Sequence, residues 1–443
     1  MKITLFSHTG NVTGGAEQCL LEYVDVLIKR GHKCRVIIPN KGPMSSELTS
    51  RKIDWTCIAY GWATKPHRKV NPRRILASTG SSIARIMQDI EKTKPDIIIT
   101  NTAVIPWGLY AGRAYKIPTI LLVHEILSDK DPSLDMAPNY TEYCKIINMN
   151  TDYIVYNSEF VKKEFSNLIK TPKTSKNIMY PLPPLDYKTI DKYYKKNEIS
   201  NELRIAIFGA ISPRKNQMEA LIAAKILKHY GINKFKIDLY GDTKANIKYT
   251  KEIRKYIKNN SLTKFVKIKG FSSDVYSRMN EYNLILSTAT YEPFGRAIIE
   301  GQLFGRVVIA NNTGGGMELV EDKYNGLLYE NGNPEALADK IKWVINNEHK
   351  AISLGLQAKQ TQYKRYINDQ RYEPLIESVD YFRGVKNNFK SLDYYDPILS
   401  LFEYNHYLNN RYKYIYRLTH NRATRYIKNN IRKVVVLAKK ALS

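Results

Sequence analysis

The chain has 443 residues, a net charge of +27 and a hydrophobic content of 43%. That length is too great for one hydrophobic core and predicts two to three domains of about 150 residues each. The positive charge predicts an anionic partner, namely a nucleotide, a nucleic acid or an acidic membrane face. No apolar stretch approaches the ~18 residues of a membrane-spanning helix, and no pair of cysteines shows CxxC spacing. We therefore expect a cytoplasmic protein with reduced thiols.

The first half alternates short apolar runs with amphipathic segments, a pattern that predicts parallel βα units. Helices are expected at 16–30 and 80–93. Gly14 and Gly15 precede the first helix, and His124 lies at the carboxyl end of an expected strand. Taken alone, the glycines indicate a tight turn and the histidine a hydrogen-bonded packing residue. The six expected strands are KITLFSH, KCRVIIP, IDWTCIAY, DIIIT, TILLVHEI and YIVYNS.

A stretch rich in Pro, Lys and Asn then interrupts this rhythm before a second βα series begins. We assign 1–180 to a first Rossmann-like domain, 181–200 to a linker, 201–365 to a second Rossmann-like domain and 366–443 to a basic tail. The predicted fold is α/β, with two doubly wound domains facing each other across a crevice. The second series has the expected strands LRIAIFGA, FKIDLYGD, FVKIKGF, NLILSTA, RVVIANN and GLLYE, and expected helices near 216–230, 247–259, 295–304 and 334–347.

The stretch TYEPFGRAIIEGQLFG in the second domain places two glutamates eight positions apart. Pro293 suits the first turn of a helix, and the amides at about 294–296 would then be free to bind a phosphate. Gly295 would let a ligand approach the backbone. Glu300, about 7 Å along the helix, is at the reach of a ribose, and Glu292 lies on the side of a sugar beyond the diphosphate. A plainer explanation is that both are surface or capping glutamates.

The neighbouring sequence favours the functional explanation. Upstream, IAIFGAISPRKNQMEALIAAKIL is a strand, a loop with Arg214 and Lys215, and a helix. Downstream, a strand is followed by TGGG, a glutamate-bearing helix start and NGLLY. With these features the chain resembles the retaining glycosyltransferases of the GT-B fold, specifically glycosyltransferase family 4. The matching motifs, from GNVTGGAEQ through VHEI and YNSEFVKKEF to GNPEALADKI, cover about residues 1–350.

The resemblance implies roles for the residues of the helix start. Glu300 matches the glutamate that binds the ribose, and Glu292 the one that contacts and orients the transferred sugar. The backbone of Phe294 and Gly295 would hold the diphosphate. Arg296 varies within the family, and it either faces the crevice beside the donor or caps charge.

The resemblance also assigns the cations. Lys215 and Arg214 match the pair that neutralises the departing diphosphate, although a solvated loop is the plainer explanation. The family often has Gly-Arg directly after this strand, whereas here Gly209 and Ala210 stand there and the cation comes later. The equivalence of Arg214 therefore stays open.

Five further residues are placed by the resemblance. Gly14 and Gly15 would lie against the donor phosphates and the acceptor, and the main chain near Phe271 and Ser272 would contact the base. His124 would lie near the reacting sugar, where it would hydrogen-bond a hydroxyl or stabilise developing positive charge. It is not assigned as a general base, because in retaining members of the family the leaving phosphate is usually proposed to take the acceptor's proton.

A metal is not expected. No Asp-x-Asp pair stands at a strand end, and Asp129 with Asp131 belongs to a loop of the first domain. We therefore expect Arg214, Lys215 and the helix start to hold the diphosphate without Mg²⁺ or Mn²⁺.

The tail is basic: residues 381–443 contain thirteen Lys and Arg against three acidic residues. Its last part has one apolar helical face bordered by cations. It could pack as helices on the first domain, lie on an anionic membrane or bind nucleic acid. We favour partial packing with contact to the inner face of the plasma membrane, because no nucleic-acid-binding motif is present.

The leading hypothesis is a retaining glycosyltransferase that moves a hexosyl or N-acetylhexosaminyl group from a nucleotide sugar, expected to be a UDP-sugar. Its acceptor would be a glycan or a lipid-linked molecule in surface polysaccharide or glycoconjugate synthesis. The alternatives are a nucleotide-sugar epimerase or a phosphorylase of the same fold, and a non-catalytic protein that binds nucleic acid or anionic lipid.

Overall fold

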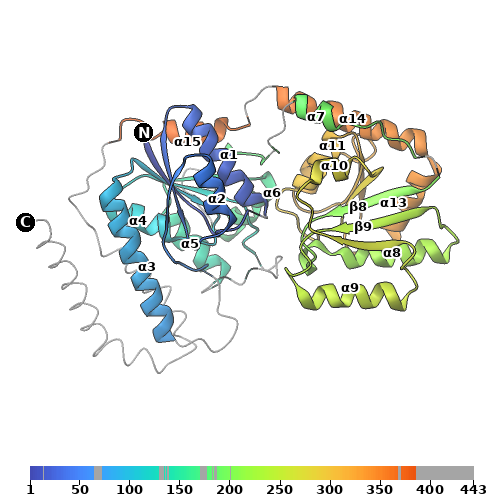
Figure 1. The fold of residues 1–443 in the computed structure, drawn as a ribbon, viewed down its shortest axis with the longest axis horizontal. Coiled ribbons are helices and arrows are strands. Elements are labelled where there is room, and N and C mark those ends of the chain that lie inside the picture. The colour runs from blue at the N-terminus through green and yellow to red at the C-terminus, as the bar shows by residue number, and fades with distance from the viewer. Residues whose placement is uncertain are drawn as a thin grey trace, which may run out of the picture.

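The computed structural model describes residues 1–385 except for 13, 64–71, 129–133, 135, 137–138, 170–176, 182, 184–186, 200 and 368–370. The described residues contain two sheets, and Figure 1 shows them as two bodies side by side, each with its own helices. Every strand pairing among them is parallel, as the near-continuous apolar runs predict. The prediction of two doubly wound α/β domains is confirmed.

The first sheet has seven strands in the order β3-β2-β1-β4-β5-β6-β7. The order in which strands are added to the sheet reverses between β1 and β4, which are parallel neighbours with Ile3 paired to Ile97. Ligands of such sheets bind at the carboxyl ends of the strands beside this reversal. The elements are β1 Lys2–Phe6, α1 Gly15–Lys29, β2 Lys33–Ile38, α2 Pro43–Ser50, β3 Asp54–Cys57, α3 Pro72–Thr93, β4 Ile97–Asn101, α4 Trp107–Tyr115, β5 Thr119–Val123, α5 Tyr140–Met149, β6 Tyr153–Tyr156, α6 Glu159–Leu168 and β7 Asn177–Ile178.

The second sheet has six strands in the order β10-β9-β8-β11-β12-β13, with its reversal between β8 and β11. All twelve strands predicted from the sequence are present. The elements from the linker onward are α7 Tyr187–Tyr193, β8 Leu203–Phe208, the 3-10 helix η1 Pro213–Lys215, α8 Gln217–His229, β9 Phe235–Tyr240, α9 Ile247–Asn259, β10 Val266–Gly270, α10 Val275–Met279, β11 Leu284–Ser287, α11 Arg296–Leu303, β12 Val307–Asn311, α12 Gly316–Leu319, β13 Leu327–Tyr329, α13 Pro334–Asn346, α14 Glu348–Ile367 and α15 Glu373–Asp380.

After α14 the chain returns to the first domain, where Figure 1 shows α15 beside α1. Leu375 and Val379 of α15 are fully buried in the core that α1 and β1 also line. Arg30 at the end of α1 donates to the Glu373 carboxylate at 2.8 Å. Part of the stretch that we assigned to the tail therefore packs on the first domain. The remaining tail, residues 386–443, lies outside the described residues, and so does the predicted membrane contact.

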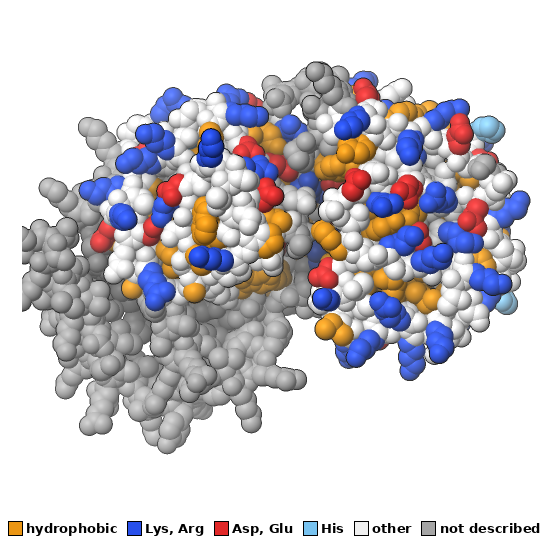
Figure 2. All heavy atoms as spheres, viewed as in Figure 1, with side chains coloured by type: hydrophobic (Ala, Val, Ile, Leu, Met, Phe, Trp, Pro, Cys, Tyr) orange, Lys and Arg blue, Asp and Glu red, His pale blue; other side chains and the backbone are white. Residues whose placement is uncertain are grey.

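The charge of the described residues is spread out. Figure 2 shows Lys and Arg side chains scattered over the visible face of both domains, with acidic side chains among them. Among the helices that the structure describes, none has the length and apolar character needed to cross a membrane.

Candidate functional site

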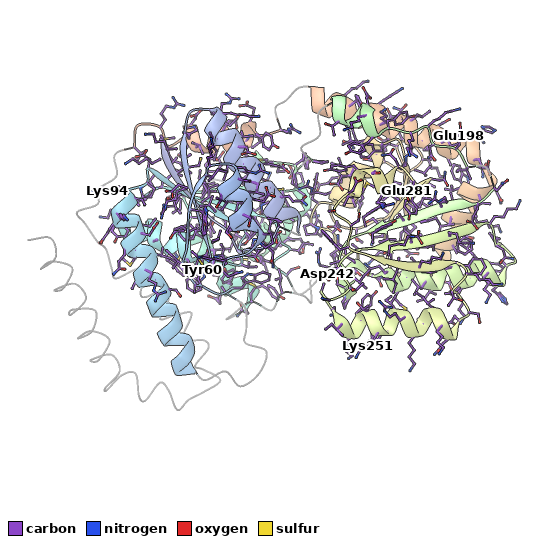
Figure 3. The ribbon with its side chains drawn as sticks, viewed as in Figure 1. Tyr60, Lys94, Glu198, Asp242, Lys251 and Glu281 are labelled. Carbon is purple, nitrogen blue, oxygen red and sulfur yellow. The ribbon has the colours of Figure 1, made fainter. Side chains whose placement is uncertain are left out.

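The carboxyl ends of the second sheet face the first domain, as Asp242 after β9 illustrates in Figure 3. Two turns meet there, one after β11 and one after β12. Gly315 donates its amide to the carbonyl of Glu292 at 2.7 Å, and Thr313 donates its hydroxyl to the carbonyl of Thr290 at 2.6 Å. Gly314 has φ +64°, and a Cβ at this position would lie 2.5 Å from the Glu292 carbonyl oxygen. The TGGG turn therefore holds the loop that carries Glu292.

Helix α11 begins within one residue of the range 295–304 expected from the sequence, but Pro293 is not in its first turn. Pro293 lies three residues before its first residue, Arg296, because Gly295 adopts a left-handed conformation with φ +109° and caps the helix. Phe294 is buried, and its ring stacks on Tyr180 with centroids 5.4 Å apart. The first amides of a helix have no partner within that helix, so the start of α11 can still bind an anion.

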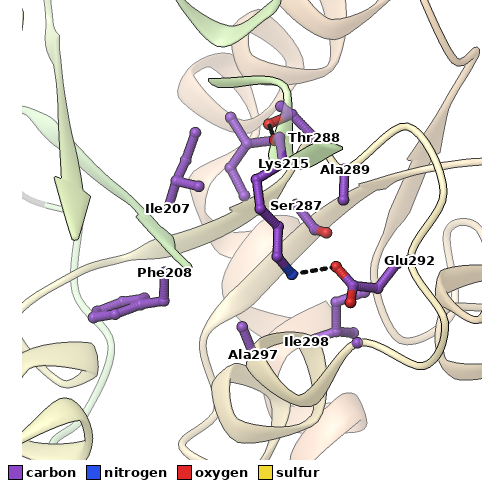
Figure 4. A pocket seen from close by; sticks show the side chains of 11 residues that line it. Ile207, Phe208, Lys215, Ser287, Thr288, Ala289, Glu292, Ala297 and Ile298 are labelled. Atoms are coloured by element: carbon purple, nitrogen blue, oxygen red, sulfur yellow. Dashed lines mark hydrogen bonds and ion pairs between the residues drawn. The ribbon is translucent and has the colours of Figure 1, made fainter. Parts of the chain in front are cut away.

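Lys215 lies opposite this helix start. It belongs to η1, which is tied to the loop after β11 because Thr288 donates its hydroxyl to the Lys215 carbonyl at 2.9 Å. Its ammonium donates to the Glu292 carboxylate at 2.5 Å, the dashed line of Figure 4. Arg214 is farther away, with a guanidinium nitrogen 3.9 Å from Glu292. Lys215, Glu292 and Gly295 line one pocket, together with Phe208.

The two cations near the pocket change the pKa of its carboxylate. Burial alone would raise the pKa of Glu292, but the Lys215 ammonium and the Arg214 guanidinium lower it below its usual value. Two cations face one carboxylate, which leaves a net positive charge beside the start of α11. Such a site suits a diphosphate, which can bind cations and helix amides together.

Glu300 and Arg296 lie at the junction of the two domains rather than in the lining of this pocket. Arg296 is 3.6 Å from Glu300 on its own helix and 3.7 Å from Glu22 of α1. It also donates to the carbonyl of Gly15 at 3.4 Å. Burial raises the pKa of Glu300 above its usual value, although Arg296 opposes this. The donor-binding roles of Glu300 and Arg296 stay predictions.

His124 lies at the end of β5, as expected, within the first domain. Its Nε2 is 2.9 Å from Asn101 Oδ1, and its ring stacks on Tyr23 with centroids 6.4 Å apart. Burial, with the neighbouring His8 and Arg296, lowers the pKa of His124 to about 3. The imidazole is therefore neutral near neutral pH, so it can donate to or accept from a hydroxyl without repelling developing positive charge.

The replacement His124→Gln is expected to lower kcat/KM for sugar transfer without changing how it varies between about pH 5 and pH 8. The folded-state pKa of about 3 means that His124 does not titrate in this range. Parallel pH profiles of the two proteins would agree with this expectation. A step near pH 6.5 that the variant lacks would contradict it.

The other predicted binding residues are divided between the domains. Gly14 caps α1, and Gly15 is its first residue. A Cβ on Gly15 would lie 3.4 Å from the Arg296 side chain, so this glycine is next to the second domain. Phe271, 62% exposed, and Ser272 follow β10 and are not part of the pocket lining. Their contact with a base stays a prediction.

A clamp between the domains, formed by Ser158, Glu318 and Tyr180, was not foreseen. Glu318 after the TGGG turn accepts the amides of Glu159 and Phe160, at 3.0 and 2.7 Å, at the start of α6. Tyr180 donates to the same carboxylate at 3.2 Å. Ser158, the N-cap of α6, donates to the carbonyl of Pro293 at 2.6 Å. The sequence shows Glu318 near a helix start but gives no signal for the helix that it meets.

The replacement Glu318→Gln is expected to speed hydrogen exchange at the amides of Glu159 and Phe160 about tenfold. A carboxylate at a helix start is favoured by the helix dipole and by charge-assisted hydrogen bonds, and the amide loses both. Exchange followed by mass spectrometry on a peptide spanning 157–162 measures the effect. Glu321→Gln, which neutralises an exposed glutamate three residues away, is the matched control. Equal exchange in both variants would contradict the clamp.

A metal centre is not formed by the part of the chain that the structure describes, since no three His, Cys, Asp or Glu residues gather there. The expectation of a metal-independent site stays a prediction.

Two family models match the chain. One, Glycosyltransferase Family 4, covers residues 13–178, and the other, Glycosyl transferases group 1, covers residues 189–364. A poly(ribitol-phosphate) alpha-N-acetylglucosaminyltransferase of Staphylococcus aureus is 30% identical over 32% of this chain and 28% of its own length. An uncharacterized glycosyltransferase of Methanocaldococcus jannaschii is 29% identical over 50% of this chain and 58% of its own length. The chain thus matches less than two thirds of either relative.

Solved structures share the fold over a longer range. Anabaena HepE in complex with UDP and glucose has a TM-score of 0.71 and 23% identity, over 86% of this chain and 100% of its own. TarM has a TM-score of 0.69 and 14% identity, over 86% of this chain and 99% of its own. With both family models and the two parallel-sheet domains, the chain is a family 4 glycosyltransferase with the GT-B fold.

Proposed function

We propose that the protein transfers a sugar from a UDP-sugar to a hydroxyl group of a glycan or a lipid-linked acceptor, with the anomeric configuration retained. The observation that carries this proposal is the pair of Lys215 and Glu292 in the pocket beside the start of α11. Lys215 and the helix amides would bind the diphosphate, and Glu292 would orient the sugar. Glu300 would accept hydrogen bonds from the ribose once Arg296 releases it.

In the proposed reaction the bond between the anomeric carbon and the diphosphate oxygen breaks, and the acceptor oxygen forms a bond to the same carbon. The acceptor's proton goes to the departing diphosphate, so atoms and charge balance without a protein base. Negative charge grows on the diphosphate as the bond breaks, and the Lys215 ammonium is held where it can stabilise that charge. The proposed reaction uses no metal ion. Arg214, Lys215 and the amides at the start of α11 would bind the diphosphate in its place.

The choice of UDP is supported by related proteins. HepE, for example, was solved with UDP-glucose. Other relatives bear on the acceptor: a capsular polysaccharide glycosyltransferase of S. aureus is 25% identical over 52% of this chain. A Campylobacter jejuni relative, 25% identical over 25% of this chain, is named for a diphospho-undecaprenol acceptor. These names support a role in surface polysaccharide or glycoconjugate synthesis.

The test is a donor screen. UDP and one UDP-sugar should raise the melting temperature by binding the folded state, whereas GDP- and ADP-sugars should not. The same UDP-sugar should release UDP when acceptor is present, and chelation with EDTA should leave the rate unchanged. A protein stabilised only by GDP- or ADP-sugars, or by none, would reject the proposed donor.

A further inference from the structure

An exposed tryptophan is held in a fixed position beside the carboxyl end of the first sheet. Trp62 follows β3 and is 47% exposed. Trp107 donates its indole N–H to the carbonyl of Gly61 at 2.7 Å, and the amide of Ala63 donates to the carbonyl of Val104 at 2.7 Å. The backbone is therefore anchored on both sides of Trp62, while about half of the side chain remains open to solvent.

A histidine with an unused nitrogen lies next to this tryptophan. Trp62 donates its indole N–H to the carbonyl of His8 at 2.8 Å, and the two ring centroids are 5.7 Å apart. The His8 side chain is only 10% exposed, and its Nε2 lies 3.5 Å from the Glu17 carboxylate. Its Nδ1 is buried and has no hydrogen-bond partner among the described residues. Because Nδ1 is buried, a ligand hydroxyl reaches it only when the surrounding side chains shift slightly, and it then gains a hydrogen bond without breaking an existing one.

Trp62 and His8 lie on the same edge of the sheet as His124. His8 follows β1, which pairs with β4, and β4 in turn pairs with β5, the strand that ends at His124. His8 contributes, after burial, to the lowered pKa of His124. Tyr60, labelled in Figure 3, donates its hydroxyl to the carbonyl of Ser7 at 2.6 Å and so fixes the end of β3 to the end of β1. This edge, beside the reversal of the strand order, is where a parallel sheet binds ligands.

We propose that Trp62 and His8 form an acceptor subsite that binds a pyranose ring, with one face of the ring on the indole and a hydroxyl on His8 Nδ1. The proposal rests on the glycosyltransfer proposed above and names the acceptor's chemistry: a carbohydrate in the first domain, not only a lipid anchor. An aromatic side chain with a few placed polar atoms is typical of small-molecule sites. A pyranose matches such a site because its C–H face can lie on the indole while its hydroxyls reach the polar atoms around it.

A lipid chain or a peptide could also contact an indole. Neither matches the neighbouring polar atoms as well, because an alkyl chain would leave His8 Nδ1 without a partner. The fixed ring also favours a small rigid ligand, since little conformational freedom of the indole is lost on binding. These other occupants are separated from a sugar by the experiment.

The experiment uses the full chain saturated with UDP and three probes: methyl β-glucopyranoside, methyl β-galactopyranoside and methyl N-acetyl-β-glucosaminide. Saturation-transfer NMR should show the ring C–H protons of at least one probe in contact with the wild type. Trp62→Ala should weaken that probe at least about tenfold, and Trp62→Phe should restore part of the loss. His8→Ala should weaken it less, because it removes one hydrogen bond. Tyr230→Ala, which truncates a more exposed aromatic on the second domain, is the control and should bind as the wild type does.

The UDP-induced rise in melting temperature is recorded for every variant, because it reports the donor site and the fold together. Binding lost in Trp62→Ala while the UDP shift stays supports the subsite. Unchanged binding in Trp62→Ala, or no probe bound to a wild type that still binds UDP, overturns the subsite and leaves the proposed function standing. A wild type that binds a pyranose at Trp62 but no UDP would overturn the donor proposal instead.

Discussion

The variant Lys215→Ala is expected to lower kcat/KM for sugar transfer about 100- to 1000-fold, the usual effect of removing one preorganised charge-stabilising group. The Lys215 ammonium lines the pocket and is held 2.5 Å from Glu292 by a loop that Thr288 fixes. It therefore needs little rearrangement when the diphosphate leaves. Steady-state transfer from the matching UDP-sugar measures the loss, and kcat should fall with kcat/KM because the charge is greatest in the transition state.

The control for this prediction is Lys248→Ala, which removes an exposed lysine of α9 and the same unit of charge. It should keep wild-type kinetics. Equal losses in both variants would point to long-range attraction of the donor rather than to the pocket. Wild-type kinetics in Lys215→Ala would exclude Lys215 as the group that stabilises the leaving diphosphate.

A pH effect accompanies the same substitution. Because its two cations lower the pKa of Glu292 in the folded protein, Glu292 stabilises the fold above the pKa of an unfolded glutamate. That contribution is lost as the pH falls through the lower folded-state pKa. Without Lys215, the effect of burial is less well balanced, and the pKa of Glu292 in the folded protein rises. Lys215→Ala should therefore lose stability on acidification at a higher pH than the wild type does.

The strands and the loop that carries Glu292 could be predicted because their signals are local. A parallel strand buried on both faces needs a short continuous apolar run. Each of the twelve runs forms a strand, although β3 and β10, at the edges of the two sheets, are only partly buried. The same holds for the loop that carries Glu292, since the strand before it and the glycines after it are visible in the sequence. Lys215, seven positions after the end of β8, was singled out by the family resemblance.

The junction between the domains could not be predicted because its contacts join residues far apart in sequence. Nothing near Arg296 shows that it reaches Glu22 of α1, 274 positions earlier in the printed sequence. The clamp of Glu318 on α6 and the return of α15 to the first domain are of the same kind. Only the place of Pro293 was wrong at α11: this residue is permitted in a first turn, but the left-handed Gly295 caps the helix after it.

The second large prediction concerns Arg306, a residue of the second domain that contacts the linker between the domains. This arginine, 1% exposed, lies between α11 and β12. Its guanidinium donates to the carbonyls of Phe304 at 2.8 Å and Tyr282 at 3.2 Å, and to that of Lys195, which follows α7. Burial lowers its pKa to about 10, so it remains charged near neutral pH. One side chain thus ties Lys195, in the linker 181–200, to the second domain.

Arg306→Ala is expected to lower the free energy of unfolding of the second domain by about 3–5 kcal/mol, because it leaves a cavity and three carbonyls without their donor. Hydrogen exchange of the β12 amides, which lie in the sheet next to the site, should become at least about a hundredfold faster. Arg278→Ala, which removes a half-exposed arginine paired with Glu281, is the control and should change stability by less than about 1 kcal/mol. Arg306→Met separates the two causes, since it fills much of the cavity but donates nothing. If the methionine variant is as stable as the wild type, Lys195 is held on the second domain by packing alone. If it loses most of what the alanine variant loses, the hydrogen bonds hold Lys195 on the second domain.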